Sequence, residues 1–163
     1  MRGILAAGLA LGLAMAGGAA AQEVTRHRIL GSDFPIAAAV EVPAGLTMVH
    51  LSGAVPPRAD RDAPAASRAA WGGDTRGQTV AVLGSIERTL RRLNLGMGDV
   101  VRMQVFLVGD PALEGRMDFD GFREFFGTAA QPNLPVRSVV QVAGLVNPGW
   151  LVEIEVSAVR RSP

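Results

Sequence analysis

Alternating apolar and polar positions predict two strands within residues 135–161, separated by an Asn-Pro-Gly turn. Apolar residues occupy every second position of the second strand, at Trp150, Val152, Ile154, Val156 and Ala158. Because successive side chains of a strand point to opposite faces, Glu153 and Glu155 are expected on the face that the apolar residues do not occupy. Val136, Val140 and Val142 mark the apolar face of the first strand, so Arg137 is expected on the same uncovered face as the two glutamates.

The pattern before this segment predicts four further strands and two helices. Strands are expected over residues 25–30, 36–42, 47–51 and 100–108, with residues 43–45 joining the second and third as a hairpin. A helix is predicted from Asp74 or Thr75 to about Leu93, with an apolar stripe along one side. A second helix is predicted to begin at Asp110-Pro111 and to end after Phe126, because Asp favours the N-cap and Pro the first helical position.

This order of elements predicts an α+β fold in which two helices cover one face of a mixed sheet. Residues 58–77 are rich in Pro, Ala, Arg, Asp and Gly without periodicity, which predicts a long surface loop anchored by Trp71. The whole chain has 163 residues, enough for one domain but hardly for two.

The composition excludes several classes of chemistry. The chain has no Lys, so a Schiff-base lysine, a pyridoxal-phosphate anchor and a P-loop lysine are excluded. It has no Cys, which removes thiol nucleophiles, thiolate metal sites and disulfides. Its net charge is only +1, so nucleic acid is not an expected partner. His27 and His50 lack nearby carboxylates at metal-ligand spacing, and no metal site is predicted.

The N-terminus predicts a secretory signal peptide over residues 1–21. Arg2 precedes an apolar run over residues 4–16, and small residues lead to Ala21. An uncleaved membrane anchor is the alternative, but the run is shorter than the roughly 20 residues that a spanning helix needs. We therefore expect export to a bacterial periplasm, with residues 22–163 forming a single domain.

Several motifs resemble those of one family. The segment 133–138, Asn-Leu-Pro-Val-Arg-Ser, and the final strand up to Arg161 are similar to the C-terminal signature of the Rid family of imine deaminases (RidA/YjgF type). Residues 95–101, the cluster from Phe122 to Phe126 and the strand end Leu51-Ser52-Gly53 resemble further parts of that family. The resemblance covers about residues 34–161.

The resemblance implies a chorismate-mutase-like fold and a homotrimer in which three sheets form a barrel-like centre, with clefts between subunits. Arg137 would bind the carboxylate of a 2-imino or enamino acid, with Ser138, Ser52 and Gly53 nearby. Glu153 would position the water that attacks the imine carbon. No cofactor or metal is required by the chemistry that the resemblance implies.

Departures from the family pattern leave three interpretations open. Ile36 stands at the family's tyrosine, Phe119 lies near its asparagine, and Val139 stands at its frequent cysteine. The chain is either an imine deaminase, a non-catalytic trimer that binds a small carboxylate or a client protein, or an enzyme of other specificity in which the loop with Trp71 contacts the substrate. Glu153 favours an enzyme, because a pure carboxylate binder gains little from a second anion.

Overall fold

The computed structural model describes residues 23–116, 118 and 120–161, so the expected signal peptide lies outside the described residues. The strands are β1 (Thr25–Arg28), β2 (Ala37–Glu41), β3 (Thr47–Ala54), β4 (Val100–Leu107), β5 (Val136–Gln141) and β6 (Val152–Arg160). The helix α1 spans Thr75–Arg92, and short 3-10 turns occur at η1 (Arg68–Trp71), η2 (Met97–Asp99), η3 (Pro111–Leu113) and η4 (Asp120–Glu124).

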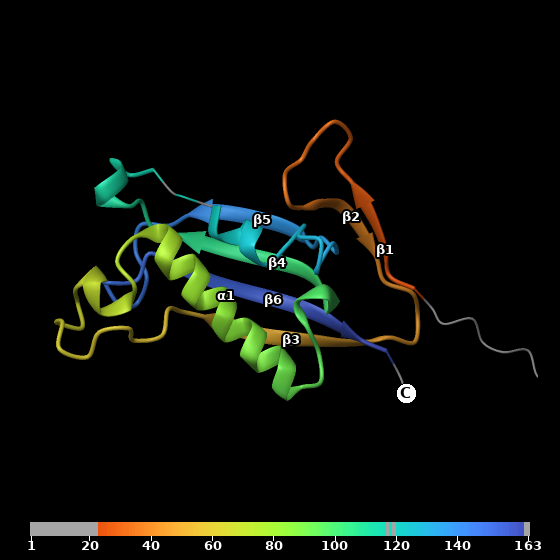
Figure 1. Ribbon diagram of the computed structural model, residues 1–163, viewed down its shortest axis with the longest axis horizontal. Helices are drawn as coiled ribbons and strands as arrows, with labels where there is room; N and C mark the ends of the chain where they lie inside the picture. The colour runs from red at the N-terminus through yellow and green to blue at the C-terminus, as the bar shows by residue number, and fades with distance from the viewer. Residues whose placement is uncertain (1–22, 117, 119, 162–163) are drawn as a thin grey trace, which may run out of the picture.

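Four strands form the main sheet in the order β3-β6-β4-β5 (Figure 1). The strand β6 is antiparallel to both β3 and β4, whereas β5 runs parallel to β4. The two C-terminal strands are therefore present as predicted, but β4 lies between them. The mixed character of the sheet is confirmed, and β5 forms one of its edges.

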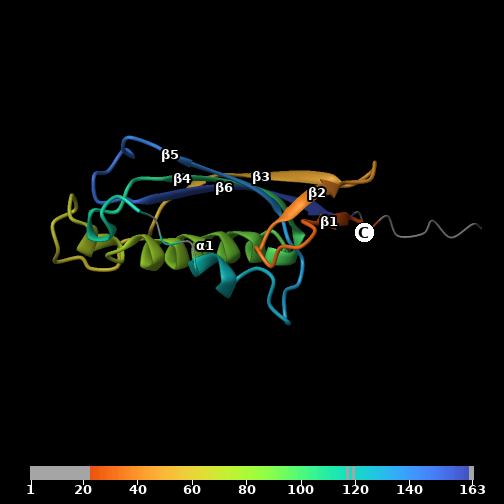
Figure 2. The same cartoon turned by 90° about the horizontal axis from the view of Figure 1, so that it is seen from above.

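The helix α1 covers one face of this sheet (Figure 2). The side chain of Asp74 accepts a hydrogen bond from the Gly77 amide, which caps the helix as the sequence predicts. Leu83, Ile86 and Leu90 are at most 1% exposed and pack against the inward side chains of the sheet. No helix of the described residues lies over the opposite face of the sheet, and this asymmetry defines a covered face and an open face (Figure 2).

The predicted second helix is wrong as an α-helix. Asp110 does cap a helical turn, since its side chain accepts a hydrogen bond from the Ala112 amide, but this turn is η3 and ends at Leu113. Glu114 then adopts a φ of 55° and Gly115 a φ of 81°, a left-handed backbone that ends helix propagation. Phe122 and Phe126 are nevertheless buried, as their spacing indicated, because η4 brings this segment against α1.

The predicted hairpin between residues 36–42 and 47–51 is also wrong. The strand β2 pairs with β1 in a separate two-stranded sheet, whereas β3 pairs with β6. The pairing with β6 lets Val49 and Leu51 pack on the main core, which local pairing with β2 alone would not provide. The expected single sheet is thus two sheets, with β1-β2 beside one end of the larger (Figure 1).

The long segment 58–77 is held against the domain by two anchors. Trp71 makes an edge-to-face contact with Trp150 at 5.5 Å, and its indole donates a hydrogen bond to the Ala65 carbonyl, which confirms its anchoring role. The second anchor is the buried carboxylate of Asp110. It accepts hydrogen bonds from the Thr75 amide and hydroxyl and pairs with Arg68 at 2.8 Å.

We expect Asp110→Asn to lower the free energy of unfolding by about 2–3 kcal/mol. The amide has one acceptor oxygen where the carboxylate has two, so some of the donors around this buried group lose their partner. Burial alone would raise the pKa of Asp110, but the hydrogen bonds from Thr75 and Ala112 and the charge of Arg68 hold it below its ordinary value. The stabilisation is therefore present above the unfolded-state pKa of about 3.9 and is lost as the pH falls through the folded-state pKa.

Urea denaturation at neutral and acidic pH measures this effect. The difference between the wild type and Asp110→Asn should shrink at the acidic end, while Asp62→Asn at an exposed position serves as the matched control. An equal loss of stability at both pH values would contradict the role assigned to the carboxylate charge.

Candidate functional site

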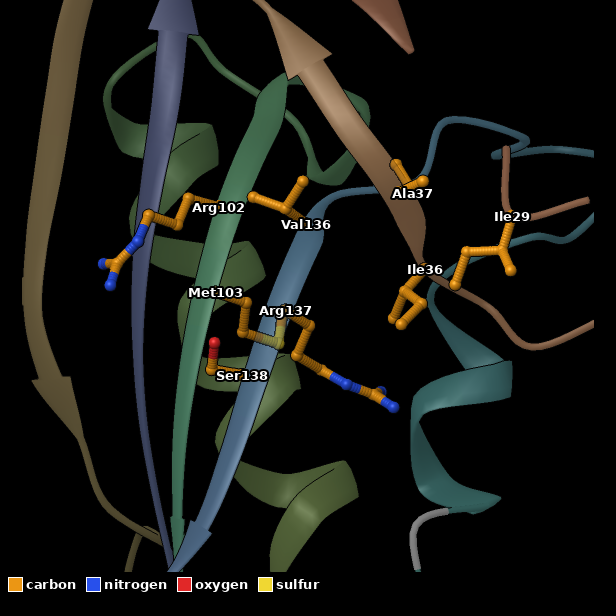
Figure 3. Close-up of a pocket in the computed structure, with 9 residues that line it drawn as sticks. Ile29, Ile36, Ala37, Arg102, Met103, Val136, Arg137 and Ser138 are labelled. Atoms are coloured by element: carbon orange, nitrogen blue, oxygen red, sulfur yellow. The ribbon is translucent and has the colours of Figure 1, made fainter. Parts of the chain in front are cut away.

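The site begins with Arg137, on the edge strand β5. Its backbone is in register with Met103 of β4, a core residue that is 1% exposed, so the Arg137 side chain leaves the sheet on the covered side. The guanidinium carbon lies 4.4 Å from the centroid of the Phe122 ring and 5.1 Å from that of Phe34. Figure 3 shows Arg137 extending toward η4 and Ile36, away from Arg102.

A pocket of about 350 Å³ lies beside β5, and Arg137 is one of the residues that line it (Figure 3). Most of the residues that line it are apolar, and two arginines and one serine supply its polar side chains. The lining residues are Ile29, Ile36, Ala37, Ala38, Arg102, Met103, Val136, Arg137 and Ser138. No acidic side chain is among them, so a cationic ligand would find no partner here.

The guanidinium of Arg137 is half-buried without an acidic partner. Burial, and secondarily the positive charge of Arg123, lower its pKa to about 10. At neutral pH the group therefore remains protonated. No hydrogen bond or ion pair joins it to any side chain in the described part of the chain. A half-buried cation in this state favours an anion, and its planar fork matches a carboxylate.

Glu153 lies on the open face of β6, opposite Phe106 of β4. Beside it the pairing of β3 with β6 shifts register between Leu51 and Ala54, so Ser52 and Gly53 lie in a bulge. A Cβ atom on Gly53 would overlap the Glu153 carboxylate and lie 3.0 Å from its Cδ. The absence of a side chain at Gly53 thus allows the carboxylate to lie directly against the β3 backbone.

The predicted site residues fall into two groups that one chain does not bring together. Arg137 and Ser138 lie at the β5 edge, and Glu153 lies with Ser52 and Gly53 toward β3. Within one chain, Arg137 and Glu153 project from opposite faces, so the expectation that Arg137 shares the uncovered face is wrong. Glu153 and Glu155 do lie on the open face as predicted.

The alternation along β5 misled the assignment because Val136 and Val140, which indicated its core face, lie at an edge strand. Val140 is 43% exposed, and Ser138 is exposed between them. Sequence reasoning also missed Phe34 as a neighbour of Arg137. A bulky apolar residue in the Gly-Ser-Asp-Phe-Pro turn was the available signal.

Two broader properties of the described residues bear on the chemistry. They contain no group of three or more His, Cys, Asp or Glu side chains arranged to hold a metal ion. Among them, no helix combines the length and apolar character needed to cross a membrane.

The described residues form an α+β domain with a single α-helix and a half-buried arginine at the edge of its main sheet. The family profile described as endoribonuclease L-PSP matches residues 35–160. The chain therefore belongs to this family, which is the Rid/YjgF family that the sequence motifs indicate. A search of curated proteins found no match.

Solved structures agree with this assignment. A Rid family protein of unknown function from Yersinia pestis has a TM-score of 0.62 and 23% identity, covering 83% of this chain and 96% of its own, which supports the fold. TdcF of E. coli, solved with bound serine, has a TM-score of 0.52 and 29% identity, with coverages of 84% and 97%. A YjgF family member from Mycobacterium tuberculosis has a TM-score of 0.50 and 28% identity, with coverages of 83% and 98%.

Proposed function

We propose that this protein hydrolyses 2-imino and enamino acids to 2-keto acids and ammonia. The observation that carries the proposal is the half-buried guanidinium of Arg137, which has no acidic partner among the described residues and belongs to a residue that lines a pocket without acidic side chains. Such a pocket suits a small carboxylate with an uncharged side chain. Family membership supports the reaction class.

In the proposed reaction, Arg137 binds the substrate carboxylate through two parallel N–H donors. Glu153 accepts a proton from a water molecule as the water oxygen attacks the imine carbon and forms the C–O bond. The imine nitrogen gains protons, and the resulting carbinolamine loses ammonia as its hydroxyl proton leaves and the keto group forms. Water is the only co-reactant, so the balance is one imine and one water giving one keto acid and one ammonia.

The reaction requires a second copy of the chain, because Arg137 and Glu153 leave opposite faces of one sheet. We propose a homotrimer in which the Arg137 pocket of one subunit meets the open face of the next. Met48 and Val140, 39% and 43% exposed, are hydrophobic residues that such contact would cover. Three polar residues lie side by side on neighbouring strands of the open face, namely Ser138, Gln104 and Glu155.

The proposal is tested by generating 2-iminopropanoate with an amino-acid oxidase and measuring its loss, with and without the protein. Faster conversion to pyruvate and ammonia than the spontaneous rate supports the proposal. If imines with small, branched and aromatic side chains all decay at the spontaneous rate beside an assembled protein, the deaminase proposal is wrong.

We expect Gly53→Ala to lower kcat/KM about tenfold or more, because the new methyl group displaces the Glu153 carboxylate and a displacement near 1 Å can cost about 10²-fold. Stability should change little, since the displaced group is the end of a flexible side chain. Steady-state kinetics and thermal unfolding measure the two effects. Gly144→Ala, where a Cβ meets no atom within 4 Å, is the control.

A second candidate is a non-catalytic trimer that binds a small carboxylate or a client protein. The bound serine in the TdcF structure favours this alternative, because it shows a small amino acid held by a related protein. Retention of carboxylate binding without imine hydrolysis would favour it for this chain.

The location of the protein is a separate proposal. We infer that residues 1–21 act as a cleaved signal peptide and direct the protein to the periplasm, on the basis of their charged start and apolar run. Mass spectrometry of the protein from a cell fraction tests this, with Gln22 expected as the first residue.

A further inference from the structure

The two aromatic rings beside Arg137 have different relations to the core. Phe122 is 1% exposed and belongs to the main core cluster, so it would be buried whether or not Arg137 were present. Phe34 is 45% exposed and lies in the connection between β1 and β2. Packing in the core therefore accounts for the position of the Phe122 ring but only in part for that of Phe34. The Phe34 ring contacts the Arg137 guanidinium.

The connection that carries Phe34 is held in place by local hydrogen bonds. The Phe34 amide donates to the Ser32 hydroxyl at 3.1 Å, and the Ile36 amide donates to the Phe34 carbonyl at 2.8 Å. Arg123 of η4 donates to the Asp33 carbonyl at 3.4 Å, which ties this connection to the same turn that carries Phe122. The ring of Phe34 is thus presented to Arg137 from a supported backbone.

An arginine side chain at a sheet edge has several rotamers, and ordering it on ligand binding has an entropic cost. A ring in contact with the guanidinium lowers that cost, because it stabilises the cation in one position before the ligand arrives. The same connection supplies Ile29 and Ile36 to the pocket wall. A single segment therefore shapes the apolar wall and supports the cation.

We propose that Phe34 is a positioning residue for Arg137, whose ring holds the guanidinium in the orientation that accepts a substrate carboxylate. The proposal rests on the proposed function only for the identity of the carboxylate. Because Phe34 acts through Arg137, replacing Phe34 should change the affinity for the carboxylate rather than the rate of the chemical step.

The probe is 2-oxobutanoate, a stable keto acid, with its Kd measured by calorimetry on the assembled protein. Phe34→Leu keeps an apolar side chain but removes the ring, and we expect its Kd to rise about fivefold, the scale of a partly exposed cation–π contact. Phe34→Tyr should restore the Kd to within about twofold, since it retains the ring. Leu30→Ala, at a 96% exposed position of the same connection, is the control and should bind as the wild type does.

Two further measurements separate positioning from a structural role. In the Arg137→Lys background, Phe34→Leu should have little additional effect, because the planar group that the ring supports is gone. In imine hydrolysis, Phe34→Leu should raise KM and leave kcat nearly unchanged. A Phe34→Leu protein with wild-type Kd would overturn the inference, as would a wild type that does not bind 2-oxobutanoate. Wild-type binding without imine hydrolysis would refute the deaminase proposal but leave the role of Phe34 intact.

Discussion

Replacing Arg137 with alanine is expected to lower kcat/KM for 2-imino acids by about 10²–10⁴-fold, because each hydrogen bond to a charged group contributes about 1.5–3 kcal/mol and two are lost. Binding of a keto acid should become undetectable at concentrations that saturate the wild type. The domain should still fold, since Arg137 has no ion pair among the described residues. Steady-state kinetics and calorimetry measure both effects.

Arg92→Ala is the matched control for this prediction, because it removes one positive charge from the exposed end of α1 at a residue that does not line the pocket. Arg137→Lys should recover only part of the affinity, since an ammonium group cannot make the planar paired contact. Normal turnover by Arg137→Ala, with its assembly intact, would refute the assignment of the carboxylate site.

Replacing Glu153 with glutamine is expected to lower kcat by about 10²–10⁴-fold, the usual contribution of a positioned general base. Keto acid affinity should stay close to that of the wild type, because the carboxylate of the ligand is bound by Arg137. The combination of lost turnover and retained binding distinguishes a catalytic role from a structural one. Rapid-quench or steady-state assays on saturating imine measure kcat directly.

Glu155→Gln is the control for that variant, since Glu155 lies two positions along β6 on the same open face. It carries the same charge but lacks the contact with Gly53 that places Glu153. Equal losses of kcat in the two variants would show that the charge of the open face matters rather than Glu153 itself.

Local patterns in the sequence predicted the elements whose boundaries depend on nearby residues. The cap at Asp74, the buried stripe of α1 and the outward direction of Glu153 all follow from side-chain spacing and capping chemistry, and the structure confirms them. Which strands pair with one another was harder to predict from the sequence. The choice of β6 rather than β2 as the partner of β3 depends on burial across more than 100 residues of sequence, which no local turn signal records.

The candidate site shows the same limit. Motifs identified Arg137 and Glu153, but the face of an edge strand such as β5 is set by its register with β4, so alternation alone placed Arg137 wrongly. Phe34 reaches Arg137 from a turn about 100 residues away in the sequence, and only the folded chain brings the two together. Residues 110–116 missed their predicted helix because Glu114 and Gly115 adopt left-handed backbone angles.

Subunit mixing tests whether Arg137 of one subunit and Glu153 of another form each site. Arg137→Ala and Glu153→Gln chains, each nearly inactive alone, are unfolded together in equal amounts and refolded into mixed trimers. Random assembly should place an intact Arg137 opposite an intact Glu153 at about one quarter of the interfaces, so about a quarter of wild-type activity should return. If mixed trimers form and activity stays at the level of the separate variants, Arg137 and Glu153 do not act across a subunit boundary, which contradicts the proposed site.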